Sequence, residues 1–520
     1  MFKRLLPFLI VFLIADIFSQ SVNMPLEHWA YRFLQRMEAK GLFHSNELRV
    51  RPVPRDKLAE ILEEIYRSSL EHPEKLSKTD TRLLHQLMSD FSDELEDKGV
   101  SDVGEEIHLF RIKESVGTVY GDLLGQQAII SNRGRQFNPD QLLSETTLGG
   151  QLRGHLGNTI GFFAEARNSL TRGEERDPDD ENFDPSQGSP VVVSGANVFR
   201  DRATAYFVWE QPWLRLEMGK DEFDWGPGYH GSATLTRNAP PADMIRLGCR
   251  FKRFKFTCMH SWLRSPLGSK YLAGHRLDFT VFRGLYLAAS ETVVYGNRNV
   301  ELSYLNPLML YHIAEHHLGD RDNNNLSFDV TYTRIPNLTL YGEWFIDDMT
   351  STQSWSQYFG NKFAWVFGGL WTDPFGLNNV DLRCEYGRIS PYVYSHEDSI
   401  NIYTHYDKII GHWLGPNGDT IFLELGWRLS RDFQIQLFGE MVRKGEGDAD
   451  TVSQPAQGDR KDFLKGVLEK RTLVGVKLVD QIRRDMFVAL SYTYQDTQNL
   501  KLGPEASYDH LARFQFYFNY

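Results

Sequence analysis

An alternation of apolar and polar residues begins at about Ile107, continues through most of the remaining chain and constrains its fold more than any other feature. In LSFDVTYT, residues 326–333, every second residue is apolar or aromatic and the residues between them are polar. Successive side chains of a strand point to opposite faces of a sheet, so this pattern predicts strands with one apolar and one polar face.

Short turns alternate with long connectors along this region. Tight turns are expected at 211–212, 252–253, 283–284, 335–337 and 430–432, and long connectors at 171–200, 224–243, 297–325, 389–419 and 444–468. Counting hairpins predicts about eighteen strands of roughly 9 to 13 residues, and this asymmetry is typical of outer-membrane barrels. A water-soluble sandwich is the alternative, but so many long strands would need two packed sheets with protected edges.

The first twenty residues, MFKRLLPFLIVFLIADIFSQ, have two basic residues followed by an apolar stretch. This pattern predicts a secretory signal peptide over residues 1–20, with a retained anchor as the alternative. No later apolar run approaches the ~20 residues of a membrane-spanning helix. We therefore expect the chain to reach the outer membrane of a Gram-negative-type cell and to cross it with strands.

Residues 21–100 differ from the rest, because their apolar residues recur with a helical spacing. Three short amphipathic helices fit, with Gly41 closing the first and Pro54 opening the second. We expect a small helical head on the periplasmic side, as a plug or a module, followed by a β-barrel over residues 101–520.

Charged residues are expected on the lumen face of the barrel, where they meet water or a polar plug. The hairpin that carries Arg246, Arg250 and Lys255 has only basic or neutral inward residues. It could attract an anionic polymer, or its charges could pair with acidic neighbours. The net charge of −12 argues against a nucleic-acid partner.

The three cysteines, Cys249, Cys258 and Cys384, share strand faces with apolar residues. We expect all three to face lipid as small hydrophobic side chains. No disulfide and no metal site is therefore predicted from them.

Two motifs raise the question of catalysis. HIAEH, residues 312–316, has the spacing of a class of zinc peptidases but lies in a connector without a strong apolar helix around it. DEFDWGPGYHG, residues 221–231, gathers three acids, although paired glycosidase carboxylates need a set separation across a cleft. Neither context fits, and we expect no catalytic residue, no metal and no cofactor.

The long connectors also carry aromatic residues among Asn, Asp and Arg. Sugar rings stack on aromatic faces, so these loops are candidates for glycan binding, with an aromatic interface belt as the alternative. The candidate polysaccharide-binding residues are Trp225, Tyr229, Arg246, Arg250, Lys255, Tyr304, Tyr311 and Trp413.

Two stretches resemble the Wzi-type capsule assembly family. The first is GKDEFDWGPG at residues 219–228, and the second runs from YLNP at 304–307 through GDRDNNN at 319–325 into a hairpin. The resemblance implies an eighteen-stranded outer-membrane barrel that holds capsular or exopolysaccharide at the cell surface without catalysis. On the matching positions it implies loop-shaping roles for Trp225, Gly226, Pro227, Gly228, Tyr304, Asn306, Pro307 and Glu315.

The head is similar to a surface-layer homology unit in PLEHWAYRFLQRMEAKGLF, residues 25–43, and RPVPRDKLAEIL, residues 51–62. Such units can grip cell-wall polymers, which makes a cell-wall polymer a candidate partner. Only one copy is visible, so a structural cap is the alternative that we favour.

The chain ends on LARFQFYFNY, residues 511–520, with Phe514, Phe516, Phe518 and Tyr520 at every second position. We expect them to face outer-membrane lipids on the strand that closes the barrel, with Tyr520 in the signal for the barrel assembly machinery. The leading hypothesis is a non-catalytic polysaccharide-binding barrel. A solute or oligosaccharide porin is the alternative, and an enzyme acting on glycans or lipids is a third.

Overall fold

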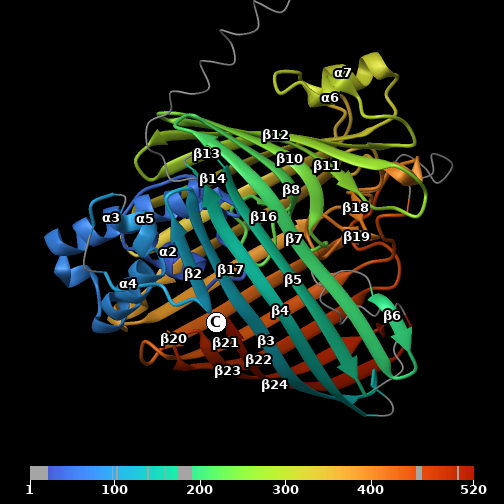
Figure 1. The fold of residues 1–520 in the computed structure, drawn as a ribbon. Helices are drawn as coiled ribbons and strands as arrows, with labels where there is room; N and C mark the ends of the chain where they lie inside the picture. Colours follow the sequence, from blue (N-terminus) through green and yellow to red (C-terminus); the bar gives the residue numbers. More distant parts are fainter. Residues whose placement is uncertain are drawn as a thin grey trace, which may run out of the picture.

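The computed structural model describes residues 21–96, 98–100, 103–137, 140–157, 160–173, 190–451, 460–500 and 503–519. Within them eighteen antiparallel strands close into a barrel, with the N-terminal helices gathered at one end and two short helices at the other (Figure 1). The predicted signal peptide, residues 1–20, lies outside the described residues. Among the described residues, no helix has the length and apolar character needed to span a membrane.

The wall strands, in chain order, are β3 (Gly117–Gly134), β4 (Gln141–Leu156), β5 (Ile160–Arg172), β7 (Asn197–Gln211), β8 (Leu214–Asp221), β10 (Ala242–Phe251), β11 (Phe254–Leu263), β12 (Lys270–Phe282), β13 (Leu285–Gly296), β14 (Asn323–Ile335), β15 (Leu338–Asp348), β16 (Lys362–Thr372), β17 (Val380–Ile389), β20 (Gly418–Arg428), β21 (Phe433–Lys444), β22 (Glu469–Arg483), β23 (Met486–Gln498) and β24 (Ala506–Asn519). The short strands β2 (Phe110–Glu114) and β6 (Pro190–Ser194) pair with β3 and β7. The expected barrel and its expected turns are confirmed. The expected strand length is exceeded by β3, β4, β7, β22 and β24, with 18, 16, 15, 15 and 14 residues, and β8 is shorter with 8.

The last strand closes the ring, because β24 pairs with β3 along its length. Phe514 lies opposite Ile129, and both side chains are exposed on the outer face. The ring of Phe518 covers Gly125, where a Cβ atom would come within 2.4 Å of it. The predicted role of this segment as the closing strand is confirmed, whereas Tyr520 lies outside the described residues.

The two faces of the wall differ as the alternation predicts. Leu277, Leu340 and Leu437 are more than two-fifths exposed on the outer face, as a lipid-facing surface requires. On the inner face the buried Arg276 pairs with Asp278 and Asp329. The three cysteines are free. The expectation that all of them contact lipid is wrong for Cys258, which is buried beneath a helix described below.

The head consists of the helices α2 (Ala30–Ala39), α3 (Arg55–Glu71), α4 (Lys78–Asp90) and α5 (Ser92–Glu96), with the short elements η3 (Glu47–Arg49), β1 (Val50–Arg51) and η4 (Pro73–Lys75). The three expected helices are present, and α5 follows as a fourth. Phe33, Leu62, Leu84 and Phe91 form its core with exposures of 1% or less. Ser77 and Asp80 form a capping box at the start of α4.

The head is bound to the short-turn end of the barrel through buried ion pairs. Arg36 of α2 is fully buried and binds Asp80 at 2.8 Å within the head. The same guanidinium binds Asp381 at 2.6 Å and Asp373 at 2.7 Å in the barrel. Burial alone would raise the pKa of Asp80, but the hydrogen bonds and charges of Arg36 and Lys40 hold it well below its ordinary value.

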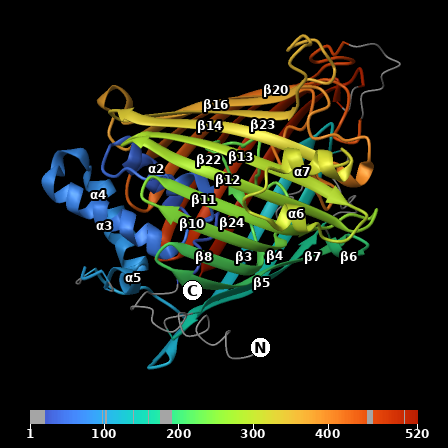
Figure 2. The same ribbon diagram turned by 90° about the horizontal axis from the view of Figure 1, so that it is seen from above.

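Further ion pairs join the head to other turns around the same rim. They are Glu64 with Arg283, Asp90 with Arg484 and Glu47 with Lys255. Figure 2 shows the head at this end of the barrel, opposite the long loops. The head therefore covers the short-turn mouth rather than hanging from one strand.

Replacing Arg36 with methionine leaves Asp80, Asp373 and Asp381 without their shared cation. Lys40 still binds Asp80 and Asp373, and Arg428 still binds Asp381. We expect this change to destabilise the docked head by ~3 kcal/mol, because three buried carboxylates are then left with two cations. Protease sensitivity of the head in increasing urea measures the loss. The matched control is Arg283→Ala, whose ion pair with Glu64 is mostly exposed and should change stability by less than ~1 kcal/mol. Equal effects of the two variants would contradict the anchoring role of Arg36.

Candidate functional site in the barrel lumen

The connector after β8 turns into the lumen instead of rising from the rim. Residues 222–241, here called the lumen segment, include β9 (Asp224–Trp225), which pairs with β1 of the head. Trp225 lies opposite Val50 and is fully buried, and a Cβ atom on Gly274 of β12 would lie 3.2 Å from its ring. The lumen segment thus bridges the head and the inner wall.

Two carboxylates of the inner wall hold the backbone of the lumen segment. Glu385 of β17 accepts hydrogen bonds from the amides of Tyr229, His230 and Gly231, at 2.7, 3.0 and 3.0 Å. Glu343 of β15 accepts from the amides of Ala233 and Thr234, at 2.8 and 2.9 Å. Consecutive amides that converge on one carboxylate form charge-assisted bonds, which are stronger than neutral ones. These bonds fix the path of the segment across the lumen.

A second connector, residues 390–417, packs over the lumen segment. It contains η7 (Ser399–Asn401), β18 (Thr404–His405) and β19 (Lys408–Ile409). The hydroxyls of Tyr394 and Tyr403 donate to the carbonyls of Ala233 and Thr234, at 2.7 and 2.8 Å. Both tyrosines are fully buried in a core that includes the inward side chains of β11, β12 and β15. This half of the lumen is therefore filled at the loop end.

Beside this core, four aromatic rings form a patch that faces the opposite half of the lumen. The ring of His230 stacks on Phe422 with centroids 4.1 Å apart, and Trp413 meets His230 edge-on at 5.3 Å. Tyr229 adjoins Phe422 at 6.2 Å and donates to Glu424 at 3.1 Å. We call Tyr229, His230, Trp413 and Phe422 the aromatic patch.

Charged groups border the aromatic patch. His230 Nε2 lies 2.8 Å from Glu440, and the guanidinium of Arg383 lies 4.1 Å above the ring of Tyr229. Burial alone would lower the pKa of His230, but the hydrogen bond and charge of Glu440 raise it above its ordinary value. The patch therefore offers flat rings, carboxylates and cations together, which is the chemistry that binds a sugar ring and its hydroxyls.

The lumen beside the patch is not fully occupied by the described residues. Lys477 points inward from β22 and is exposed, and the side chain of Arg513 on β24 keeps 32% of its surface exposed. The side chain of His230 retains 25%. Solvent therefore reaches inward-facing groups next to the patch.

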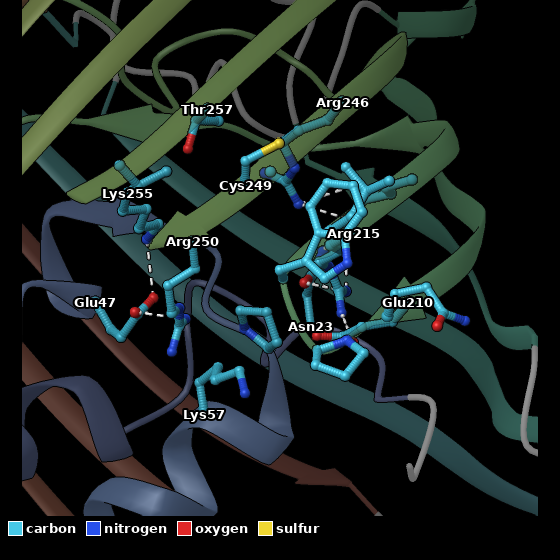
Figure 3. A pocket seen from close by; sticks show the side chains of 18 of the residues that line it. Asn23, Glu47, Lys57, Glu210, Arg215, Arg246, Cys249, Arg250, Lys255 and Thr257 are labelled. Atoms are coloured by element: carbon cyan, nitrogen blue, oxygen red, sulfur yellow. Dashed lines mark hydrogen bonds and ion pairs between the residues drawn. The ribbon is translucent and has the colours of Figure 1, made fainter. Parts of the chain in front are cut away.

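The basic hairpin lines a different site, a cavity of about 80 Å³ between the head and the strands β7, β8, β10 and β11 (Figure 3). Lys255 and Arg250 bind Glu47 of the head at 2.9 and 2.5 Å. Arg246 binds Glu217 at 2.7 Å and lies 3.5 Å from Asp221. Each of the three inward basic side chains, Arg246, Arg250 and Lys255, has an acidic partner, as the charge-pairing alternative predicted.

The structure separates the eight candidate polysaccharide-binding residues into three groups. Tyr229 and Trp413 belong to the aromatic patch, whereas Arg246, Arg250 and Lys255 lie at the short-turn end. Trp225, Tyr304 and Tyr311 are fully buried. The expectation of exposed rings at these three positions is wrong, because neighbouring elements of the same chain cover their faces.

Four residues of the site were not predicted as site residues from the sequence: Glu343, Glu385, His230 and Phe422. For Glu343 and Glu385 the alternation predicted only that they face the lumen. On the two neighbouring strands, Glu343 pairs in register with Asp329 and with Val366. Neither of these residues is a cation that could neutralise its charge. A carboxylate without such a neighbour is a signal that it binds something else in the lumen. The sequence does not say that the partner is the backbone of residues 233–234.

The HIAEH motif forms part of α7 (Tyr311–Leu318), a helix of eight residues, whereas the sequence predicted only that no strong apolar helix surrounds the motif. Glu315 is buried, whereas His312 and His316 are exposed on another side of the helix. Burial, with Asp320 and Asp322 nearby, raises the pKa of Glu315 to about 8. Among the described residues no group of three or more His, Cys, Asp or Glu side chains could hold a metal ion.

The three acids of residues 221–224 each face a cation. Asp221 lies near Arg246, Glu222 pairs with Arg202 at 2.9 Å and Asp224 with Arg51 at 3.0 Å. They hold the lumen segment and the head in place. No two of them face each other across an open cleft as a glycosidase pair would.

The cavity at the head yields a prediction for pH. Burial alone would raise the pKa of Glu47, but Lys255 and Arg250 lower it to about 2. Because this is below the value of about 4.3 in the unfolded chain, the contact stabilises the head above pH ~5 and is lost as pH falls towards 2.

We therefore expect Glu47→Gln to cost up to ~3 kcal/mol at pH 6 and progressively less at lower pH. Urea unfolding of the head from pH 6 to pH 3 measures the difference between the two proteins. A difference that does not change with pH would contradict the ion pair as its cause.

Comparison with known proteins identifies the family of the chain. The family model of the capsule assembly protein Wzi matches residues 203–510, a range that includes the lumen segment and the aromatic patch. A comparison with curated protein sequences gives no match.

Among solved structures, the Escherichia coli outer membrane protein Wzi, which is involved in group 1 capsule assembly and is a carbohydrate-binding β-barrel, is 12% identical with a TM-score of 0.60. The match covers 96% of this chain and 99% of that one, and it shows the same fold. OprD of Pseudomonas aeruginosa is 11% identical with a TM-score of 0.43, and the match covers 77% of this chain and 93% of that one. OccAB1 of Acinetobacter baumannii is 9% identical with a TM-score of 0.44, and the match covers 77% of this chain and 96% of that one. With the Wzi model matching more than half of its length, this outer-membrane barrel belongs to the Wzi capsule assembly family.

Proposed function

We propose that this protein binds or assembles capsular or exopolysaccharide at the cell surface and catalyses no reaction on it. Membership of the Wzi family and the carbohydrate binding of the E. coli barrel support a polysaccharide partner. The observation that carries the proposal is the aromatic patch, because Tyr229, His230 and Trp413 retain partial exposure beside charged groups.

The orientation follows from the two ends of the barrel. Short turns of outer-membrane barrels face the periplasm and long loops face the outside. This rule supports a periplasmic position for the head and a position below the outer mouth for the lumen segment. The polymer then enters from the loop end and stops at the patch. Outer-membrane lipids contact the apolar outer face.

Two further partners stay predictions. The terminal aromatic signal implies the barrel assembly machinery, and the surface-layer homology likeness of the head implies a cell-wall polymer. Pro52 and Pro54 of the likeness line the cavity against the barrel wall. This position favours the structural cap, because part of the segment that would grip a polymer is already packed against the barrel.

Retention of the polymer tests the proposal directly. We expect cells that lack the protein to release their own exopolysaccharide, and purified protein to bind it without shortening or deacylating it. Trp413→Ala should weaken binding roughly fivefold to tenfold, because one aromatic contact is worth about 1 kcal/mol. The matched control is Trp355→Ala, since Trp355 is 55% exposed at the loop end but stacks on Trp344 of the outer face. Equal retention with and without the protein would overturn the proposal.

A porin is the second candidate, and the exposure of the inward-facing Lys477 and Arg513 favours it. The head across the short-turn mouth and the lumen segment held by Glu385 and Glu343 argue against a porin.

We expect the purified protein to show no large steady conductance in planar bilayers. Glu385→Ala removes the acceptor of three backbone amides and should produce frequent opening events. Glu505→Ala, which breaks an exposed pair with Arg135, is the control and should stay closed. A large steady channel in the unmodified protein would favour the porin.

A further inference from the structure

The connector between β13 and β14 folds onto the outside of the barrel. It contains α6 (Leu302–Leu305) and α7, which lie over β11–β13 at the loop end in both ribbon views (Figures 1 and 2). Tyr311 stacks on His275 of β12 at 4.3 Å, and Tyr304 meets Tyr295 of β13 at 4.9 Å. Residues 297–322 are here called the outer flap.

The wall beneath the outer flap belongs to the outer face. His275 precedes the exposed Leu277 by two residues on β12, and Glu291 follows the exposed Leu287 by four residues on β13. Side chains two residues apart on a strand share a face. His275 and Glu291 would therefore point into the surrounding membrane if the flap did not cover them, and such polar groups are costly there.

The structure shows what these two polar residues do. Glu291 accepts hydrogen bonds from the amides of Tyr311 and His312, at 2.9 and 2.7 Å, and His275 Nε2 lies 2.8 Å from the same carboxylate. A carboxylate at the start of a helix satisfies free amides and complements the helix dipole. Glu291 is thus a clamp that holds α7 against the outer wall.

The base of the outer flap is fixed by a second set of contacts. Arg298 binds Asp322 at 2.8 Å, and the hydroxyl of Tyr304 donates to the same carboxylate at 2.7 Å. With Ala314, Tyr304 and Tyr311 bury their side chains against Ala273 and Val293 of the wall. The flap is accordingly a packed part of the barrel exterior.

The surface that the outer flap turns away from the wall is apolar. Five large aliphatic side chains are exposed within twelve residues: Leu302 80%, Leu305 39%, Leu308 88%, Leu310 57% and Ile313 46%. Single exposed leucines are ordinary on protein surfaces, but a contiguous apolar patch marks a surface that another phase or molecule covers. Leu310, the residue before α7, and Ile313 lie on one flank of the helix with His317 beside them, while His312 and His316 lie on the other.

We propose that the outer flap lies in the outer leaflet of the membrane, with these five aliphatic side chains among the lipid acyl chains. The apolar patch is continuous with an interface that the barrel already has, because the exposed Leu277 and Leu287 follow directly below the clamp. An amphipathic helix that lies in a membrane interface buries its apolar face about 5–10 Å into the boundary between headgroups and acyl chains. Leu310 and Ile313 then point to the lipid, and His312 and His316 to the headgroups and water.

A spin label at Leu308 tests this placement. In protein whose Cys249, Cys258 and Cys384 are replaced by alanine, Leu308→Cys and, in parallel, Leu302→Cys are labelled and reconstituted into phosphatidylcholine vesicles. Collision with oxygen, which concentrates in lipid, is compared with collision with a water-soluble nickel chelate. Leu277→Cys on the outer face and Asp448→Cys in an exposed loop give the lipid and water references.

We expect the labels at positions 308 and 302 to favour oxygen over the nickel chelate at least fivefold more than the label at position 448. A ratio equal to that at position 448 would place the patch in water and overturn the proposal. Protection from both reagents would mean that protein covers the patch, as in contact with a second copy, and would overturn it as well. Two labelled positions guard against a local effect of either substitution on folding.

Discussion

The hydrocarbon core of a membrane offers no partner to a backbone amide or carbonyl, and the rest of this structure depends on that constraint. A sheet can meet it only by closing, and here it closes where β24 pairs with β3. Closure fixes a ring of eighteen strands, and a ring of that size is wider than its own inward side chains can fill. The interior therefore needs additional chain, which the head supplies from one end and the two inward connectors supply from the other.

The head and the two inward connectors are attached to the barrel in the same way. In each case a buried charge is neutralised by a group that is distant in sequence. Arg36 of the head binds Asp373 and Asp381, 337 and 345 residues later. Glu385 and Glu343 instead bind backbone amides of the lumen segment, which replaces a cation by the partial charges of peptide groups. Glu291 uses the same chemistry on the outside at the start of α7. Polar groups in the wall thus mark the places where another part of the chain is attached.

Alternation, turns and the closing strand could be predicted from the sequence because each depends on local spacing. The partners of Lys255 and Arg250 could not, since Glu47 lies about two hundred residues away and nothing local specifies it. The same holds for Trp225 and Tyr311, whose aromatic rings indicate loops but not whether the loop turns inward, outward or onto the wall. Glu291 is an acid on a strand face whose other residues are apolar, and this pattern indicates from the sequence that another part of the chain covers it. Its partner, the start of α7, became visible only with the fold.

The grip of Glu385 and Glu343 on the lumen segment has a consequence for how this site can diversify. Both carboxylates bind main-chain amides, so the side chains of Tyr229, His230 and Ala233 contribute nothing to these five bonds. Almost any residue except proline can supply the amide. Related barrels can therefore exchange the side chains that face the lumen while the segment keeps its course. A fixed backbone with replaceable side chains lets one scaffold present different chemical groups to the lumen.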